Sequence, residues 1–198
     1  MSETRLHTVL QRIAKDLAAS GAAYALIGGL AVSTRTEPRF TRDLDLAVAV
    51  ANDKEAEALV GFLKARGYHI NTLVEQEAAA RLATVRLVPS GEPTVIVDLL
   101  FASSGIEPEI VVAAEPIEVI EGVVIRVATI AHLIATKVLS RDDHRRPQDR
   151  MDLVNLLGAA SNIDITTARH ALEIIQERGF NRGKDLTAEL NNFIQMLR

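Results

Sequence analysis

Cysteine is absent from the sequence, which excludes disulfides and cysteine-based zinc sites. No apolar run approaches the roughly 18 residues that a membrane-spanning helix needs. The N-terminal stretch MSETRLHTVLQRIAKDL has mixed charge and lacks the apolar core of a signal peptide. We therefore expect a cytoplasmic protein with no membrane partner.

The charge balance argues against a protein that binds every polyanion, because the net charge is −4. Apolar residues make up 48% and charged residues 24% of the 198 residues, which suits one sizeable domain or a domain with a small helical annex. The charge is uneven: Glu107 to Glu121 carries five glutamates and no basic residue, whereas Lys137 to Arg150 carries five Lys or Arg against three Asp. If the protein meets nucleotides or RNA, we expect the second stretch to make the contact.

Apolar periodicity and turn residues predict an α+β fold, with a small mixed β-sheet flanked by helices and a helical C-terminal part. We expect strands at 24–27, 44–50, 83–88, 94–101, 118–120 and 123–127. Helices are expected at 6–17, 30–36, 52–67, 107–113, 129–140, 148–158, 166–178 and 184–197. The character of the chain changes near residue 128, so we separate 1–128 from 129–198, although the two parts could share one continuous core.

Two carboxylates stand close together in RFTRDLDLAVAV, whose second half alternates like a β-strand. Side chains two residues apart on a strand point to the same face, so Asp43 and Asp45 would lie side by side next to an apolar core. Like charges at that distance repel, and burying them unpaired is costly. The pair is therefore either the solvated face of an edge strand or a set of ligands for a cation.

Two further features point to the same place. In ALIGGL a short apolar strand runs into Gly28 and Gly29, where backbone N–H groups could approach a phosphate, although a plain turn has the same pattern. Asp98 interrupts the apolar run TVIVDLLF, where it could be neutral or pair with Arg86 on the neighbouring strand. Three carboxylates beside such a turn need a common positive partner, and Mg²⁺, which binds carboxylates and substrate phosphates together, is the natural one.

The spacing of GG, DLD and the later isolated Asp resembles the nucleotidyltransferase superfamily. More narrowly, IGGLAVSTRTEPRFTRDLDLAV looks like the AbiEii-type toxins of bacterial toxin–antitoxin systems, including their MenT-like mycobacterial group. The segment from Arg39 to Asp43 matches their usual approach to the acidic pair. TKVLSRDDHRRPQDRMDLVNLL and ERGFNRGKDL are similar to their downstream segments, so the resemblance spans most of residues 24–186.

The chain departs from the family pattern at two points. Many members have Gly-Ser where this chain has Gly28-Gly29, so a serine contact to phosphate is missing, and Ser33 is not assumed to replace it. The family's Lys/Arg-Asp step is Gln148-Asp149 here, which leaves the relative roles of Asp149 and Asp152 open. If both lie on one helix, their i, i+3 spacing places them on one face.

The resemblance implies a Mg-dependent enzyme that transfers a nucleoside monophosphate from an NTP to a hydroxyl and releases pyrophosphate. It implies that Asp43 and Asp45 hold two Mg²⁺ ions, with Asp98 at the ion that activates the acceptor. Lys137 would contact the triphosphate, although by composition it could equally lie on a solvated helix face. The nucleotide-binding residues implied are Gly28, Gly29, Arg39, Thr41, Lys137, Asp149 and Asp152. For Asp149, a favourable charge at a helix N-terminus after Pro147 is the simpler interpretation.

Thr41 lies two residues before the acidic pair, where a plain hydroxyl at the strand entry is the simple interpretation. A regulatory hypothesis is that phosphate on Thr41 would add a charge of about −2 beside the metal-binding carboxylates and block nucleotide entry. We expect His132 and His144 in core or solvent roles rather than at a metal.

The resemblance also implies a cognate antitoxin as partner and RNA as acceptor, with the 3′ end of tRNA as the expected site. Arg141, Arg145 and Arg146 could then hold RNA phosphates. Aromatic residues make up only 4%, so backbone contacts would outweigh base stacking. Two alternatives stay open: an acceptor that is a protein side chain or a small molecule, and a catalytically inert nucleotide-binding or antitoxin-like partner.

Overall fold

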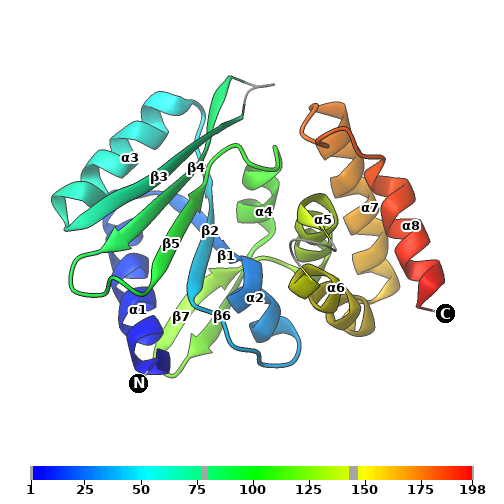
Figure 1. Cartoon of the computed structure of the whole chain (residues 1–198), viewed down its shortest axis with the longest axis horizontal. Coiled ribbons are helices and arrows are strands. Elements are labelled where there is room, and N and C mark those ends of the chain that lie inside the picture. The colour runs from blue at the N-terminus through cyan, green and yellow to red at the C-terminus, as the bar shows by residue number, and fades with distance from the viewer. Residues whose placement is uncertain (1, 77–79, 143–146, 198) are drawn as a thin grey trace.

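The computed structural model describes residues 2–76, 80–142 and 147–197. Within these residues, seven strands form one mixed sheet in the order β3-β4-β5-β2-β1-β7-β6 (Figure 1). The strands are β1 Ala23–Ile27, β2 Asp43–Ala49, β3 Tyr68–Gln76, β4 Arg81–Pro89, β5 Ile96–Leu100, β6 Glu115–Ile120 and β7 Val123–Val127. The helices are α1 Ser2–Ser20, α2 Gly28–Arg35, α3 Asp53–Ala65, α4 Glu107–Ala113, α5 Ile130–Ser140, α6 Pro147–Ala159, α7 Asn162–Glu177 and α8 Leu186–Met196. The predicted α+β fold, with its mixed sheet and helical C-terminal part, is confirmed.

The central strands of the sheet combine parallel and antiparallel pairing. β2 pairs antiparallel with β1 and parallel with β5, and β4 pairs antiparallel with β5. The register places Ile27 opposite Asp45, Asp45 opposite Asp98, and Asp98 opposite Arg86. One row therefore crosses these four strands from Ile27, the residue before α2, to Arg86, and it continues to Thr72 of β3.

Helices pack against the sheet and against one another. α1 contacts β1 and β7, α3 contacts β3 and β4, and both α2 and α4 contact β1 and β2. The C-terminal helices α5 to α8 gather beside this unit, on the right in Figure 1. In the described residues, no helix is long and apolar enough to cross a membrane.

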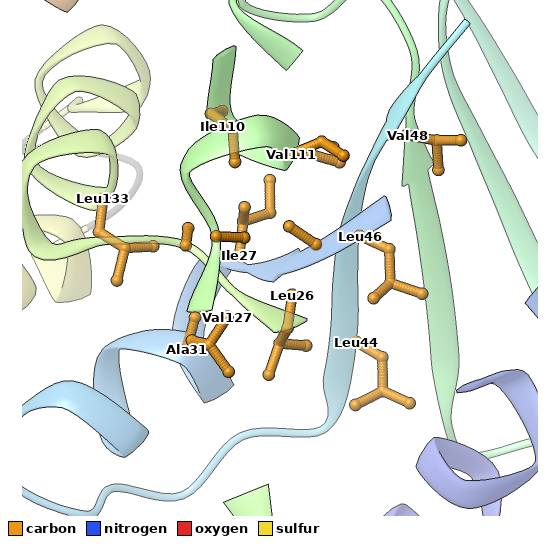
Figure 2. Close-up of a cluster of buried hydrophobic side chains, with 14 of the residues drawn as sticks. Leu26, Ile27, Ala31, Leu44, Leu46, Val48, Ile110, Val111, Val127 and Leu133 are labelled. Carbon is orange, nitrogen blue, oxygen red and sulfur yellow. The ribbon is translucent and has the colours of Figure 1, made fainter. Parts of the chain in front are cut away.

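The buried core is a continuous cluster of apolar side chains that runs from Val9 in α1 to Phe193 in α8. Figure 2 shows part of it, in which Leu26 and Leu46 of the central strands belong to the same cluster as Ile110 of α4 and Leu133 of α5. Side chains from both sides of residue 128 thus belong to the same cluster. The boundary between 1–128 and 129–198 stays a prediction.

Several element boundaries differ from the sequence expectation. The strand β3 was not expected, because every residue after Tyr68 in HINTLVEQ is at least partly exposed and no apolar alternation marks it. It exists because it pairs with β4. The helix α7 begins at Asn162 rather than at 166, since Ser161 and Asp164 form a capping box. The N-cap predicted at Asn52 is present, and its side chain accepts from the backbone N–H of Glu55 at 3.1 Å.

Candidate active site

The two carboxylates of DLD lie on one face of β2. Leu44 and Leu46, which alternate with them, are fully buried, whereas Asp43 and Asp45 are only partly buried. Both carboxylates line a cavity of about 600 Å³. Asp98 of β5 also lines it, because the parallel register of β2 and β5 places Asp98 beside Asp45. Asp43, Asp45 and Asp98 therefore share one cavity.

Gly28 and Gly29 begin α2 at the edge of this cavity, and each has a steric reason to be glycine. Gly28 has φ of +66°, and a Cβ there would lie 1.9 Å from Oδ2 of Asp45. A Cβ on Gly29 would lie 2.5 Å from Nη2 of Arg39. The two glycines thus make room for a carboxylate and a guanidinium, a reason that sequence reasoning missed. Contact with a phosphate stays a prediction, and of the two only Gly28 lines the cavity.

Burial and mutual repulsion raise the pKa values of two carboxylates in the acidic cluster. The pKa of Asp45 is raised to about 6, chiefly by burial and also by the neighbouring Asp98 and Asp43, against the opposing effects of Lys137 and the Gly29 N–H. Burial and Asp98 also raise the pKa of Asp43, while Arg86 and Arg42 oppose them. A cation placed between these carboxylates would reverse the shifts.

Asp98 is bound by the arginine considered as its partner from the sequence. Arg86 on β4 donates to both oxygens of Asp98, from Nε at 2.9 Å and from Nη2 at 2.7 Å. The ion pair lies at the cavity, which Arg86 also lines. Both oxygens of Asp98 thus accept a hydrogen bond from one guanidinium, while Asp45 lies beside Asp98 on β2.

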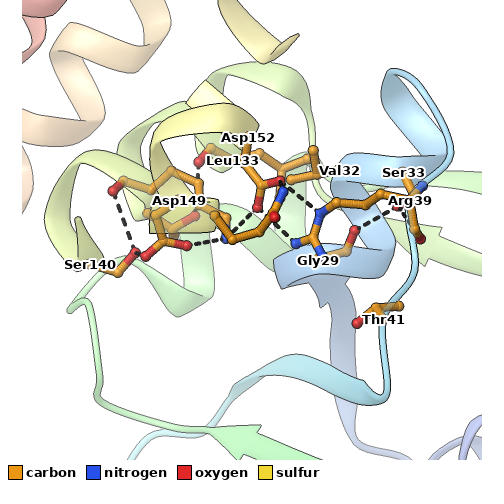
Figure 3. A network of polar contacts seen from close by, with 12 residues as sticks. Gly29, Val32, Ser33, Arg39, Thr41, Leu133, Ser140, Asp149 and Asp152 are labelled. Atoms are coloured by element: carbon orange, nitrogen blue, oxygen red, sulfur yellow. Dashed lines mark hydrogen bonds and ion pairs between the residues drawn. The ribbon is translucent and has the colours of Figure 1, made fainter. Parts of the chain in front are cut away.

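A chain of buried polar contacts joins α5 and α6 to the segment before β2 (Figure 3). Nζ of Lys137 lies 2.6 Å from Asp149 and 2.8 Å from Asp152. Asp152 also accepts two hydrogen bonds at 2.8 Å from Arg39. Ser140 donates to the other oxygen of Asp149 at 3.0 Å, a contact that sequence reasoning did not include.

The two acids of α6 differ in their surroundings. Asp152 is fully buried between Lys137 and Arg39, whereas Asp149 lines the cavity. Burial alone would raise the pKa of Asp152, but hydrogen bonds from Arg39 and Lys137 outweigh it and lower the pKa overall. Lys137 is 9% exposed and lines the cavity, so it does not lie on a solvated helix face.

Thr41 and Arg141 do not line the cavity of the three aspartates. Thr41 is half-buried, and its hydroxyl lies 3.4 Å from the carbonyl oxygen of Asp43. It lines a separate groove together with Arg39. The guanidinium of Arg141 lies over the ring of Phe193 at 5.0 Å.

Arg145, Arg146 and His144 lie outside the described residues. His132 is buried in α5, where its Nδ1 lies 2.8 Å from the Thr129 hydroxyl and burial lowers its pKa. Arg182, between α7 and α8, lines the same cavity as the three aspartates. The sequence did not indicate Arg182 as a site residue, although the segment ERGFNRGKDL that contains it is part of the family resemblance.

The donor set of the cavity fits Mg²⁺. In the part of the chain that the structure describes, no three His, Cys, Asp or Glu side chains already converge as a complete metal cage. Mg²⁺ does not require one, because it usually binds through one or two carboxylates, substrate phosphates and water. Asp43 and Asp45 offer such oxygens, and burial together with the neighbouring carboxylate of Asp98 raises the pKa of each, so a bound cation would stabilise their charged forms.

The fold is similar to solved nucleotidyltransferase structures. An antigenic nucleotidyltransferase-like protein from Paracoccidioides brasiliensis superposes with a TM-score of 0.59 at 19% identity, over 99% of this chain and 90% of that chain. The antibiotic-resistance factor ANT(2'')-Ia superposes with a TM-score of 0.50 at 18% identity, over 100% of this chain and 96% of that chain. At these identities the likeness concerns the fold alone.

Sequence comparison identifies the family. No curated protein matches the chain at a significant level. The family described as nucleotidyl transferase AbiEii toxin, type IV TA system, matches residues 9–197, which is nearly the whole chain. The protein therefore belongs to the AbiEii family of nucleotidyltransferase toxins of toxin–antitoxin systems.

Proposed function

We propose that this toxin is a Mg-dependent enzyme that transfers a nucleoside monophosphate from an NTP to an RNA hydroxyl, with the 3′ end of tRNA as the acceptor. The observation that carries the proposal is the shared cavity, in which three aspartates from two adjacent strands face the lysine of α5. An NTP brings phosphates and Mg²⁺ to such a site, and the carboxylates provide negative charge where the cation binds.

Each aspartate has a proposed role. Asp43 and Asp45 would hold two Mg²⁺ ions, and Asp98 would hold the ion on the acceptor side. When bound, the ions supply charge stabilisation for the transferring phosphoryl group and lower the pKa of the attacking hydroxyl. Asp98 could accept the proton of that hydroxyl, because its carboxylate lines the cavity beside Asp45.

Lys137 is the proposed contact for the triphosphate. Its ammonium is held at 2.6 Å by Asp149 and at 2.8 Å by Asp152, so its position is set before a nucleotide arrives. Arg39 would act through Asp152, which it binds at 2.8 Å from two nitrogens. Gly28 would let the backbone at the start of α2 approach a phosphate, since it lines the cavity without a side chain.

The acceptor is tested by label transfer. The protein is incubated with Mg²⁺, each α-labelled NTP in turn, and either total RNA or total protein, with Asp43→Ala as the inactive control. We expect label on RNA in the tRNA size range, lost in Asp43→Ala and in EDTA. Label on protein alone, or on a small molecule alone, would assign a different acceptor. No label with any acceptor, together with an absence of toxicity in cells for both the native protein and Asp43→Ala, would indicate an inert partner protein.

A cognate antitoxin is the proposed protein partner, since the family is that of toxin–antitoxin systems. Co-expression with the neighbouring open reading frame should relieve growth arrest by the native protein. Asp43→Ala should cause no arrest with or without that partner.

A further inference from the structure

The loop between α7 and α8, residues 178–185, reaches the catalytic cavity through Arg182. In Figure 1 this loop joins the two C-terminal helices at the upper right, close to the segment that leads into α4. The loop lies within the segment ERGFNRGKDL that contributes to the family resemblance, but none of the proposed roles uses it. Its anchoring, its backbone conformation and its arginine nevertheless point to a binding function.

Contacts on both sides hold the loop in place. Arg178 donates to Glu109 of α4 at 2.6 and 3.1 Å and to the carbonyl of Gly105. The ring of Phe180 packs where Gly105 has no side chain, because a Cβ there would lie 2.5 Å from the ring. Nζ of Lys184 donates to carbonyl oxygens at the end of α5, at 2.8 Å to Arg141 and 3.2 Å to Leu139. The loop therefore joins the β5–α4 connection to the α5 terminus.

The backbone of the loop turns through three left-handed residues, with φ of +78° at Gly179, +55° at Arg182 and +74° at Gly183. Glycine adopts this conformation without steric cost, whereas a side chain with a Cβ disfavours it. Among the described residues, Ala80 is the other non-glycine with positive φ. Two of the three left-handed residues are thus glycines, whereas the third is arginine, although its Cβ disfavours this backbone conformation.

The side chain of Arg182 lies at the cavity. Arg182 lines it together with Lys137 and the three aspartates, and its Nη2 donates to the carbonyl of Ser103 at 3.3 Å. Ser103 belongs to a rigid turn, because the buried Glu107 accepts from the backbone N–H groups of Ser103 at 2.9 Å and Ser104 at 2.7 Å. A planar guanidinium held at such a position suits bidentate recognition of a phosphate.

We propose that Arg182 binds a phosphate of a bound substrate, and that the loop 178–185 exists to present it. This inference rests on the proposed function, since it assumes that phosphate-bearing substrates enter the cavity. The phosphate belongs either to the NTP or to the backbone of the RNA acceptor. A guanidinium binds either kind of phosphate in the same way, so NTP binding and RNA binding are measured separately.

The test uses Arg182→Gly in the full chain, because glycine relieves the left-handed backbone while removing the guanidinium. Arg182→Lys keeps the charge but not the planar fork. Arg169→Ala is the control for loss of one positive charge on α7, where Arg169 contacts Asn191 at 3.0 Å. Melting temperature, binding of a fluorescent non-hydrolysable NTP with Mg²⁺, and binding of tRNA without nucleotide are measured for each variant.

We expect Arg182→Gly to melt at or above the temperature of the native protein and to bind one substrate at least about ten-fold more weakly. Weaker NTP binding would mean that Arg182 binds the triphosphate. Weaker tRNA binding, with the slope of log K against log[salt] reduced in magnitude by about one, would mean that Arg182 binds the backbone of the acceptor. Arg182→Lys should recover part of the loss. Unchanged binding of both substrates, or equal losses in Arg169→Ala, would overturn the proposal.

Failure of the proposed function has a different signature. If the native protein binds NTP but labels no RNA, the acceptor assignment fails, and the NTP measurements then decide the role of Arg182. In that case unchanged NTP binding by Arg182→Gly would refute the inference.

Discussion

Arg86 and Asp98 lie directly opposite each other on β4 and β5, and the guanidinium binds both carboxylate oxygens. The side chain of Asp98 is 10% exposed, whereas that of Arg86 is 41% exposed on the open side of the pair. Arg86 therefore supplies positive charge to a cluster in which Asp98 raises the pKa of both Asp43 and Asp45. A cation that binds Asp98 must compete with this guanidinium.

Removal of Arg86 should consequently lower the stability of the metal-free protein but strengthen metal binding. We expect Arg86→Gln to lower the melting temperature of the metal-free protein, because the acidic cluster loses its neighbouring cation. The same variant should bind Mn²⁺ roughly 3- to 10-fold more tightly, since a positive charge a few ångströms from the ion is gone. Titration with Mn²⁺ followed by electron paramagnetic resonance measures the affinity. Weaker Mn²⁺ binding would mean that Arg86 orients Asp98 for the ion rather than competing with it.

Asp45 should make the metal-free protein less stable at neutral pH. Its pKa is raised from the ordinary 3.8 to about 6, so the folded protein binds this proton more tightly than the unfolded chain does. The contribution of Asp45 to stability is therefore greatest in acid and falls as the pH rises to 6. We expect Asp45→Asn to melt higher than the native protein at pH 7 without metal, with the difference shrinking towards pH 4.

Magnesium provides the complementary measurement for Asp45. Addition of Mg²⁺ at pH 7 should raise the melting temperature of the native protein and have little effect on Asp45→Asn. Thermal unfolding in EDTA and in Mg²⁺ gives both results. If Asp45→Asn melts lower than the native protein in EDTA at pH 7, the carboxylate of Asp45 stabilises the fold even without metal.

Gly28 should tolerate no side chain. Gly28→Ala places a Cβ 1.9 Å from Asp45 Oδ2 and forces alanine to a φ of +66°. Gly122→Ala is the matched control, because its φ is +77° and nothing lies within 4 Å of the added Cβ. The control should lose about 1–2 kcal/mol of stability and keep its activity. Gly28→Ala should lose more stability and at least about 100-fold in nucleotide transfer, since Asp45 must move. Similar activities in the two variants would contradict this steric role.

Asp152 should matter more for folding than Asp149. Asp152→Asn leaves Arg39 without its partner carboxylate and weakens one of two contacts to Lys137, which we expect to cost about 3 kcal/mol. Asp149→Asn should cost less, because Asp152 still holds Lys137. The pKa of Asp152 is lowered, so its stabilising effect should be complete at pH 7 and disappear in strong acid. Urea unfolding at pH 7 and pH 3 tests both points, and equal losses for the two variants would contradict them.

Thr41 offers a test of regulation. Its hydroxyl lies beside the backbone of Asp43, so a phosphate there would bring negative charge close to the proposed metal site. We expect Thr41→Asp to lower nucleotide transfer at least about ten-fold, while Thr41→Val stays active. Mass spectrometry of the protein from its native host would detect the modification. A fully active Thr41→Asp, together with an unmodified native protein, would remove the hypothesis.

Local patterns predicted much of the fold but not all of the site. The strand β2, the N-cap Asn52 and the helices of the C-terminal part follow from periodicity and capping residues, which act over a few positions. β3 escaped prediction because its side chains are largely exposed, so no apolar pattern records its pairing with β4. Arg182 escaped because a positive φ on a non-glycine residue leaves no signature in the sequence.

The sequence by itself determined which side chains share a face. Alternation along β2 puts Asp43 and Asp45 together, and helical spacing does the same for Asp149 and Asp152. Only the tertiary structure decided what those faces meet. The register of β2, β5 and β4 brings Asp45, Asp98 and Arg86 into one row, and Arg39 meets Asp152 across 113 positions of the chain. Periodicity encodes the direction of a side chain, whereas its partners depend on strand register and helix packing, which are non-local.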